Sequence, residues 1–261
     1  MKPDKIKISD SILSLGSCFS TEMSRRLSGC GYKVLDNPFG VLFNPVSIAN
    51  AIKFLADRHL FTADDVVPRD TNPVRKSTAG HQSGFVSFYH HGSFVRPTPE
   101  EFLNDANTSL EKASEAFRNA QWIIVTFGTA WTYRHIERNI TVANCHKHPA
   151  WEFRREMLEI DSIVRTWNGI TGEYADKRFL FTVSPIRHKK DGMHGNQLSK
   201  ATLLLAVDRI VSSRPNTCYF PSYEIVLDEL RDYKWFAEDQ VHPSQEAIDI
   251  VWDRFKHAML E

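Results

Sequence analysis

A cysteine near the start of the chain and an aspartate–histidine pair near its end are the residues best suited to chemistry. Cys18 follows an apolar run that stops at Gly16, where a helical pattern begins. Asp239 and His242 are three residues apart in a non-helical segment, so the carboxylate can accept the imidazole Nδ1–H and leave Nε2 as a base. A thiol with an oriented imidazole base is suited to nucleophilic acyl transfer. The three residues therefore form a candidate catalytic triad.

A strand, a glycine turn and a helix must position Cys18. The apolar residues 11–15 predict the strand, and the helix is predicted by apolar residues at every fourth position, namely Phe19, Met23 and Leu27. Backbone N–H groups and the positive end of the helix dipole meet at this turn, so we expect the thiol pKa to fall below its usual value of about 8.5. Two alternatives stay open: Cys18 as a buried structural cysteine, and Ser17 as the nucleophile.

The composition limits the class of protein. The 261 residues are 42% hydrophobic and 25% charged, which is typical of a globular domain with a real core. Lys plus Arg (32) equals Asp plus Glu (32), so no overall field attracts nucleic acid. No run reaches the length of a membrane span, and no leader is recognised, so a soluble cytoplasmic protein is expected. The four cysteines show no CxxC pairing and are expected to be free thiols.

Strands alternate with helices along the chain, which predicts an α/β fold, a three-layer α/β/α sandwich around a parallel sheet. Nearly continuous apolar runs at 121–127 and 178–183 predict strands that are buried on both faces. Helices are expected at 98–120, 151–167 and 196–212. A single domain is expected over residues 1–261. The loose polar stretch at about 62–96 is expected to be an insertion or lid, and its His90 and His91 to lie in a solvated loop.

Polar residues in the loops after the strands are candidates for the substrate site, because ligands of such sheets bind at the carboxyl ends of the strands. We expect His146, Arg187 and His188 to contact the substrate; for Arg187 a surface ion pair is the alternative. Cys145, His146 and His148 are of metal-ligating types, but their spacing fits no standard zinc pattern. No metal and no cofactor are therefore expected.

The motif Gly16-Ser-Cys-Phe-Ser20 resembles the signature of the GSCFA domain family, with Ser20 where the family name has Ala. The resemblance covers nearly the whole chain. That family is similar to the SGNH hydrolase and acyltransferase superfamily, whose first block reads Gly-Asp-Ser and whose last reads Asp-x-x-His. An SGNH-hydrolase-like fold with flavodoxin-like topology is implied. The further matching segments are 37–45, 128–131, 143–147, 184–188, 196–206 and 239–244.

The resemblance assigns a role to each residue of the triad. Cys18 falls on the superfamily's nucleophilic serine and Ser17 on its aspartate. His242 falls on the base, and Asp239 on the acid that orients it. The resemblance thus implies an esterase or acyltransferase that forms a thioester.

The superfamily binds the oxyanion with the nucleophile's own N–H, a glycine N–H after the second strand and an asparagine side chain after the third. Gly40 is the candidate glycine. Ala130 or a neighbour occupies the asparagine position, so Thr129, Asn44 or Asn144 is a candidate replacement. One such donor is worth about 3 kcal/mol.

Two functions of different classes follow from these residues. The first is hydrolysis or transfer of an acyl ester on a small molecule or carbohydrate, with an acyl-CoA as one candidate donor substrate. The second is a ligand-binding or scaffold protein with a degenerate site, which the missing asparagine favours. The sequence does not separate hydrolysis from transfer, and it leaves the oligomeric state open.

Overall fold

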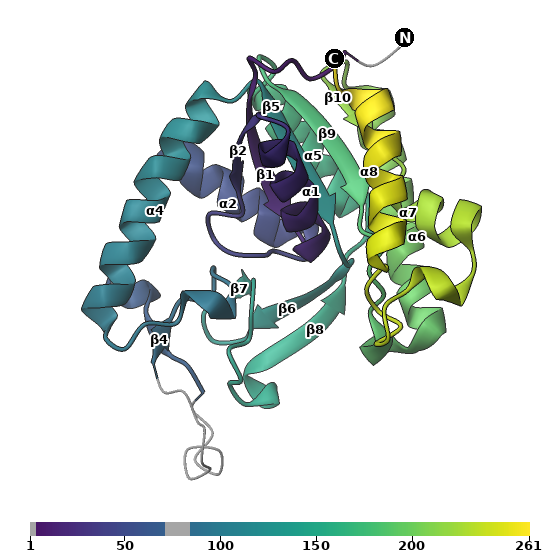
Figure 1. The fold of residues 1–261 in the computed structure, drawn as a ribbon. Coiled ribbons are helices and arrows are strands. Elements are labelled where there is room, and N and C mark those ends of the chain that lie inside the picture. The colour runs from purple at the N-terminus through teal and green to yellow at the C-terminus, as the bar shows by residue number, and fades with distance from the viewer. Residues whose placement is uncertain (1–3, 71–83) are drawn as a thin grey trace.

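A five-stranded parallel sheet lies at the centre of the computed structural model, which describes residues 4–70 and 84–261 (Figure 1). Counted along the chain, the order of its strands is the 2-1-3-4-5 of a flavodoxin-like sheet, with the switch point between β1 and β5. The predicted parallel sheet is therefore confirmed. From one edge to the other the strands are β10 (Thr217–Tyr219), β9 (Arg178–Val183), β5 (Trp122–Phe127), β1 (Ser11–Gly16) and β2 (Lys33–Asp36).

Helices cover both faces of this sheet, as predicted for a three-layer sandwich (Figure 1). Alternate residues of each strand enter two separate cores. On β5, Ile123 and Val125 face one core, and Trp122 and Ile124 face the other. Burial on both faces explains why the strand is an unbroken apolar run. The first core is shared with α2 (Pro45–Asp57), α4 (Pro99–Asn119), α5 (Ile160–Glu173) and α6 (Gly192–Ser213), and the second with α1 (Cys18–Gly29) and α8 (Gln245–Met259).

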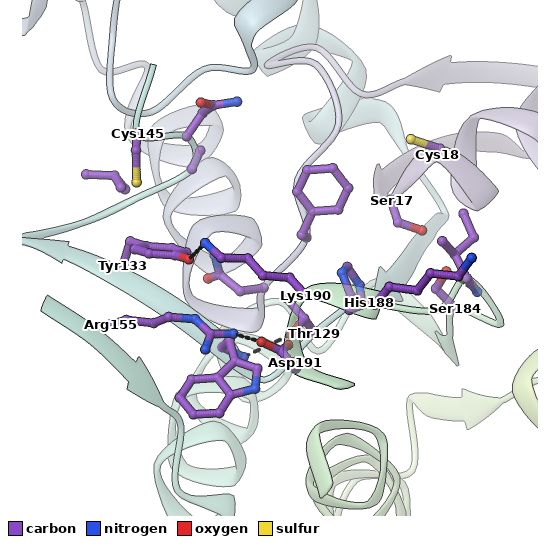
Figure 2. Close-up of a pocket in the computed structure, with 18 of the residues that line it drawn as sticks. Ser17, Cys18, Thr129, Tyr133, Cys145, Arg155, Ser184, His188, Lys190 and Asp191 are labelled. Atoms are coloured by element: carbon purple, nitrogen blue, oxygen red, sulfur yellow. Dashed lines mark hydrogen bonds and ion pairs between the residues drawn. The ribbon is translucent and has the colours of Figure 1, made fainter. Parts of the chain in front are cut away.

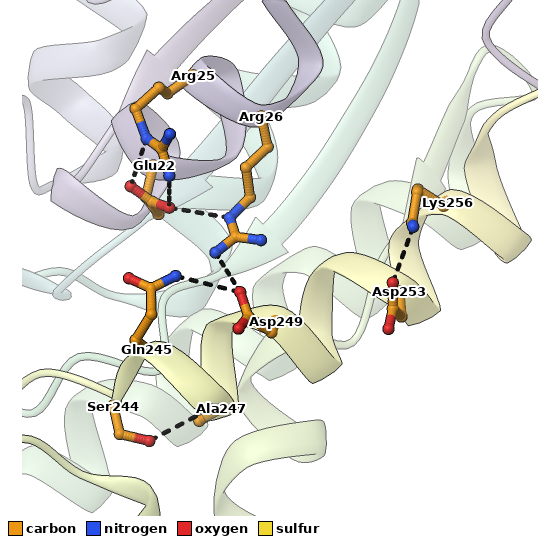
Figure 3. A network of polar contacts seen from close by, with 9 residues as sticks. All are labelled: Glu22, Arg25, Arg26, Ser244, Gln245, Ala247, Asp249, Asp253 and Lys256. Carbon is orange, nitrogen blue, oxygen red and sulfur yellow. Dashed lines mark hydrogen bonds and ion pairs between the residues drawn. The ribbon is translucent and has the colours of Figure 1, made fainter. Parts of the chain in front are cut away.

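Helices α1 and α8 carry the two ends of the candidate triad, since α1 begins at Cys18 and α8 begins three residues after His242. Arg26 of α1 joins the two helices, with its Nη2 2.5 Å from Asp249 Oδ1 of α8 (Figure 3). Ser244 caps α8 by accepting a hydrogen bond from a backbone N–H of the first turn. This ion pair links the helix that follows the nucleophile turn to the helix that follows the histidine loop.

A second, antiparallel sheet lies beyond the carboxyl edge of the central sheet (Figure 1). The helix predicted over 151–167 is wrong in its first half, because residues 153–157 form a strand and α5 begins only at Ile160. The charged run in this segment is compatible with a helix. It forms a strand because it pairs along its whole length with β6. The sheet has the order β7 (Ile140–Val142), β6 (Trp131–His135), β8 (Phe153–Met157).

The stretch 62–96 is predicted to be an insertion or lid. Its residues 71–83 lie outside the described residues. Its described part holds the short antiparallel pair β3 (Val67–Pro68) and β4 (Phe85–Val86). His90 is buried among aromatic rings, so the expectation of a solvated loop is wrong for this residue. The lid role and the single domain remain predictions. The chain continues from α6 through α7 (Ser222–Glu224) and a π-helix at Ile225–Leu230 to α8.

Candidate active site

The turn that presents Cys18 is possible only with glycine at position 16. Gly16 has a φ of +150°, and a Cβ there would lie 2.4 Å from the backbone oxygen of Thr126 on β5. Its N–H donates to Asn37 Oδ1 at 2.8 Å, and its carbonyl accepts from Leu42 N–H at 2.8 Å. The turn is therefore tied to β5 and to the loop after β2. Cys18 becomes the first residue of α1 at the switch point of the sheet.

Cys18 lines a pocket of about 730 Å³ at the carboxyl edge of the central sheet, between this sheet and the antiparallel one (Figure 2). The volume is in the range of small-molecule sites, about 300–1,000 Å³. Ser17 also lines it, and its buried hydroxyl has no hydrogen-bond partner among the described residues. Of the other residues predicted for the site, the pocket brings together Asn44, Thr129, Arg187, His188 and His242.

The pKa of the Cys18 thiol is raised rather than lowered, so that expectation is wrong. The side chain keeps contact with solvent, but the surrounding protein buries part of it, and burial disfavours the thiolate. A hydrogen bond with its own backbone N–H opposes this effect and is the smaller cause. The thiol is therefore neutral at rest and needs a base to take its proton.

His242 and Asp239 form the predicted pair. Nδ1 of His242 lies 2.6 Å from Oδ2 of Asp239, and the other carboxylate oxygen accepts from the backbone N–H groups of Val241 and His242. The bond with His242, followed by these backbone bonds, holds the pKa of the Asp239 carboxyl well below its usual range. The charged carboxylate favours the tautomer with hydrogen on Nδ1. In the described part of the chain Nε2 has no partner, and it is free to act as a base.

Arg187 supports the loop that carries His242. Its guanidinium carbon lies 3.6 Å from the ring centroid of Phe236, and its backbone N–H donates to Val241 O at 3.1 Å. Its Nη1 lies 3.4 Å from Gln240 O. The alternative of a surface ion pair is not what the structure holds, since Arg187 is buried and lies in the wall of the pocket.

Lys200 is a residue of this region that the sequence analysis missed. The side chain is 1% exposed, and its Nζ donates to Gly128 O and Ser184 O, both at 2.6 Å. Burial lowers its pKa to about 7. Lys200 thus ties the carboxyl ends of β5 and β9 together, next to Thr129 and His188. The feature of the sequence that could have indicated Lys200 is its position among the apolar residues of the buried face of α6.

His188 is a neutral side chain at pH 7. Burial, followed by the nearby charge of Lys200, lowers its pKa to about 4. Its backbone N–H donates to Asn196 Oδ1 at 2.9 Å, which ties the end of the loop after β9 to α6. His188 lines the pocket, so it can offer a neutral hydrogen-bonding group to a ligand.

Three residues predicted for the site do not line the pocket: Asp239, which is bonded to His242, and also Gly40 and His146. Gly40 has a φ of +73°, and its N–H donates to Asn37 O at 2.7 Å within a turn, so it is not available to an oxyanion. His146 is buried with Nε2 2.8 Å from Ser87 O. The predictions for Gly40 and His146 are wrong because a carbonyl of its own turn already accepts the Gly40 N–H, and because His146 is buried outside the pocket.

The three candidates for the missing asparagine all line the pocket, and they differ in how far their polar atoms are already bonded. Thr129 shares its hydroxyl with Ser199 Oγ at 3.1 Å and with a backbone N–H. Asn44 caps α2, and its Nδ2 donates to Ser47 Oγ at 3.0 Å. Asn144 uses only its oxygen, and its amide nitrogen has no partner among residues 4–70 and 84–261. The described residues contain no group of three side chains arranged to hold a metal.

The buried histidines predict acid lability. His90 and His146 have pKa values lowered by burial to about 3 and about 4, whereas an unfolded histidine titrates near 6.5. Below pH 6.5 the unfolded chain binds more protons than the folded one. The free energy of unfolding therefore decreases as the pH is lowered, by about 1.4 kcal/mol per pH unit for each group. Urea unfolding at pH 7, 6 and 5 should show this fall. His90→Phe should reduce the slope of the free energy of unfolding against pH by the amount that corresponds to about one bound proton. An unchanged slope would contradict the prediction.

The fold and the pocket define an α/β/α protein with a flavodoxin-like sheet and, at its switch point, a pocket lined by both apolar and polar side chains. A family model described as the GSCFA family matches residues 11–255, so the chain belongs to the GSCFA family. The resemblance to this family is thereby confirmed. No curated protein matches the chain. A solved structure from Streptococcus pneumonia, whose description names platelet activating factor, is similar with a TM-score of 0.44 and 8% identity over 95% of this chain and 83% of that one.

The described helices include none that is both long and apolar enough to cross a membrane. All four cysteines are free thiols, as expected.

Proposed function

We propose that the protein hydrolyses or transfers an acyl group through a thioester on Cys18, with His242 as the base and Asp239 as the group that orients it. One observation carries the proposal. An imidazole that is 2.6 Å from a carboxylate and has an unbonded Nε2 lines the same pocket as a cysteine at the first residue of a helix. The similarity of the GSCFA motifs to those of the SGNH superfamily supports the same roles.

The raised pKa of Cys18 defines how the first half-reaction proceeds. Nε2 of His242 takes the thiol proton as Sγ attacks the acyl carbon of the ester. The carbon–oxygen bond of the ester breaks, and the imidazolium returns its proton to the departing alkoxide. In the second half-reaction His242 takes a proton from water or from an acceptor hydroxyl, whose oxygen attacks the carbon of the thioester. The carbon–sulfur bond breaks, and the imidazolium returns the proton to the sulfur of Cys18.

The oxyanion needs a donor in place of the superfamily's glycine, because the N–H of Gly40 is engaged. We assign the N–H of Cys18, at the uncapped start of α1, and the unpartnered hydroxyl of Ser17. A buried hydroxyl without a partner is a group that a substrate can satisfy. Asn144 supplies a further donor from the pocket wall.

The substrate we propose is an acylated small molecule or carbohydrate, with an acyl-CoA as one donor. Trp131, Tyr133 and Phe43 line a pocket far larger than an acetyl group requires. These rings can stack against a sugar and keep water from the thioester. Trp131 and Tyr133 belong to the antiparallel sheet and Phe43 to the loop after β2, and no described residue of 62–96 lines the pocket.

The test is incubation with a chromogenic acyl ester, with and without a panel of sugars, followed by mass spectrometry of both protein and products. An acyl adduct on a peptide containing Cys18 is the expected result. Acyl-sugar formation at the expense of hydrolysis would identify a transferase. Equal release with and without every acceptor would identify an esterase.

A ligand-binding or scaffold protein is the second candidate, and the engaged N–H of Gly40 and the occupied hydroxyl of Thr129 favour it. Such a protein needs no activated nucleophile. Absence of both acyl release and a Cys18 adduct under every condition would support it over the enzyme.

A further inference from the structure

The charges in the pocket wall are strongly unbalanced. The wall contains four cationic side chains, Arg155, Arg187, Lys189 and Lys190, and one carboxylate, that of Asp191. The chain as a whole has a net charge of 0. The excess is therefore a property of this pocket and not of the protein surface in general.

Most of this positive charge is not neutralised within the protein. Arg155 forms an ion pair with Asp191. No carboxylate of the described residues pairs with Arg187, Lys189 or Lys190. Arg187 is buried and Arg155 is half-buried, and such cations attract an anion of the ligand more strongly than exposed ones do, whereas Lys189 and Lys190 are exposed.

Lys190 and Arg155 lie on the side of the pocket away from the nucleophile. Figure 2 shows Cys18 and Ser17 at one side, Tyr133 and Arg155 at the other, and the side chain of Lys190 reaching toward Tyr133. Nζ of Lys190 donates to the Tyr133 hydroxyl at 2.7 Å, which leaves two of its hydrogens for a ligand.

Arg155 is held in place from two directions. Its guanidinium carbon lies 3.9 Å from the ring centroid of Trp131, and the buried Asp191 carboxylate accepts from its Nη2. A cation fixed in this way loses little entropy when it binds a ligand.

We infer that this side of the pocket binds an anionic group of the substrate, a phosphate, sulfate or carboxylate, through Lys190 and Arg155, while the acyl group lies at Cys18. The inference rests on the proposed function in taking the pocket as the substrate site. Trp131 and Tyr133 beside the cations fit a ring attached to the anion. Two sources share this chemistry: a phosphate-bearing acyl donor and an anionic sugar acceptor.

The test is calorimetric titration of the Cys18→Ala protein with coenzyme A, glucose 6-phosphate and glucose. We expect at least one anionic probe to bind more tightly than glucose, and its affinity to fall as salt is raised. Lys190→Ala should weaken that binding about tenfold, as expected for loss of a charge-assisted hydrogen bond. Lys190→Arg should retain it. Lys112→Ala, on the exposed face of α4, is the matched control and should change nothing.

The two anionic probes separate the sources of the anion. Binding of coenzyme A alone places the anion on the donor, and binding of glucose 6-phosphate alone places it on the acceptor. The inference is overturned if neither anion binds better than glucose, or if Lys190→Ala and Lys112→Ala have equal effects. Because binding is measured without Cys18, failure of acyl transfer alone would overturn the proposed function and leave the anion site standing.

Discussion

Replacement of His242 with Ala should lower the rate of acyl-enzyme formation by about 10²–10⁴-fold, the range of general base catalysis. The neutral thiol of Cys18 loses the group that takes its proton. Asp239→Asn should cause a loss in the same range, because an amide does not favour the tautomer with a free Nε2. The measurement is the burst of alcohol release from a chromogenic ester, with His257→Ala as the control. His257 is an exposed histidine of α8 outside the pocket.

The two losses should not multiply. If the residues act as one unit, the double variant should be about as slow as His242→Ala alone. Independent, multiplicative losses would place Asp239 outside the catalytic machinery. Thermal unfolding distinguishes a loss of catalysis from a loss of folding. Asp239 and His242 are both half exposed, so their replacement should leave the melting temperature nearly unchanged.

Cys18→Ala should abolish the acyl adduct and lower turnover by about 10⁴-fold or more, because it removes the attacking atom. Ser17→Ala should keep the adduct on Cys18 and reduce its rate of formation, as expected for a lost oxyanion donor. Peptide mapping of the trapped protein is the measurement. Cys30→Ala, an exposed cysteine at the end of α1, is the matched control.

The same pair of variants decides between the two candidate nucleophiles. An adduct that persists in Cys18→Ala and disappears in Ser17→Ala would reverse their roles. Both side chains line the pocket, and the Ser17 hydroxyl has no partner in the described residues, so either side chain can reach a substrate.

Local sequence determined the nucleophile turn and the histidine pair. The apolar run into Gly16 and the four-residue repeat after it are patterns within one strand and one helix. Asp239 and His242 are three residues apart, so their contact needs only the local loop. The order of strands and helices likewise determined the layered fold, because a parallel sheet requires a crossover after each strand.

Only the tertiary structure decided the environment of these residues. The pKa of Cys18 rises because the surrounding protein partly buries the thiol. This effect outweighs the lowering of the pKa that the position at the start of a helix predicts. Gly40 is excluded because Asn37 in its own turn already accepts its N–H, and His146 is excluded because it is buried against Ser87 of another loop.

The antiparallel sheet and Lys200 depended on contacts between distant segments. Residues 153–157 become a strand through pairing with β6, and Lys200 is satisfied by carbonyls of Gly128 and Ser184, which lie in the loops after β5 and β9. The sequence of residues 153–157 does not indicate pairing with β6, and the sequence around Lys200 does not indicate these two carbonyls. Sequence patterns report local periodicity and residue type, whereas burial, pairing and hydrogen-bond satisfaction arise only when remote segments meet.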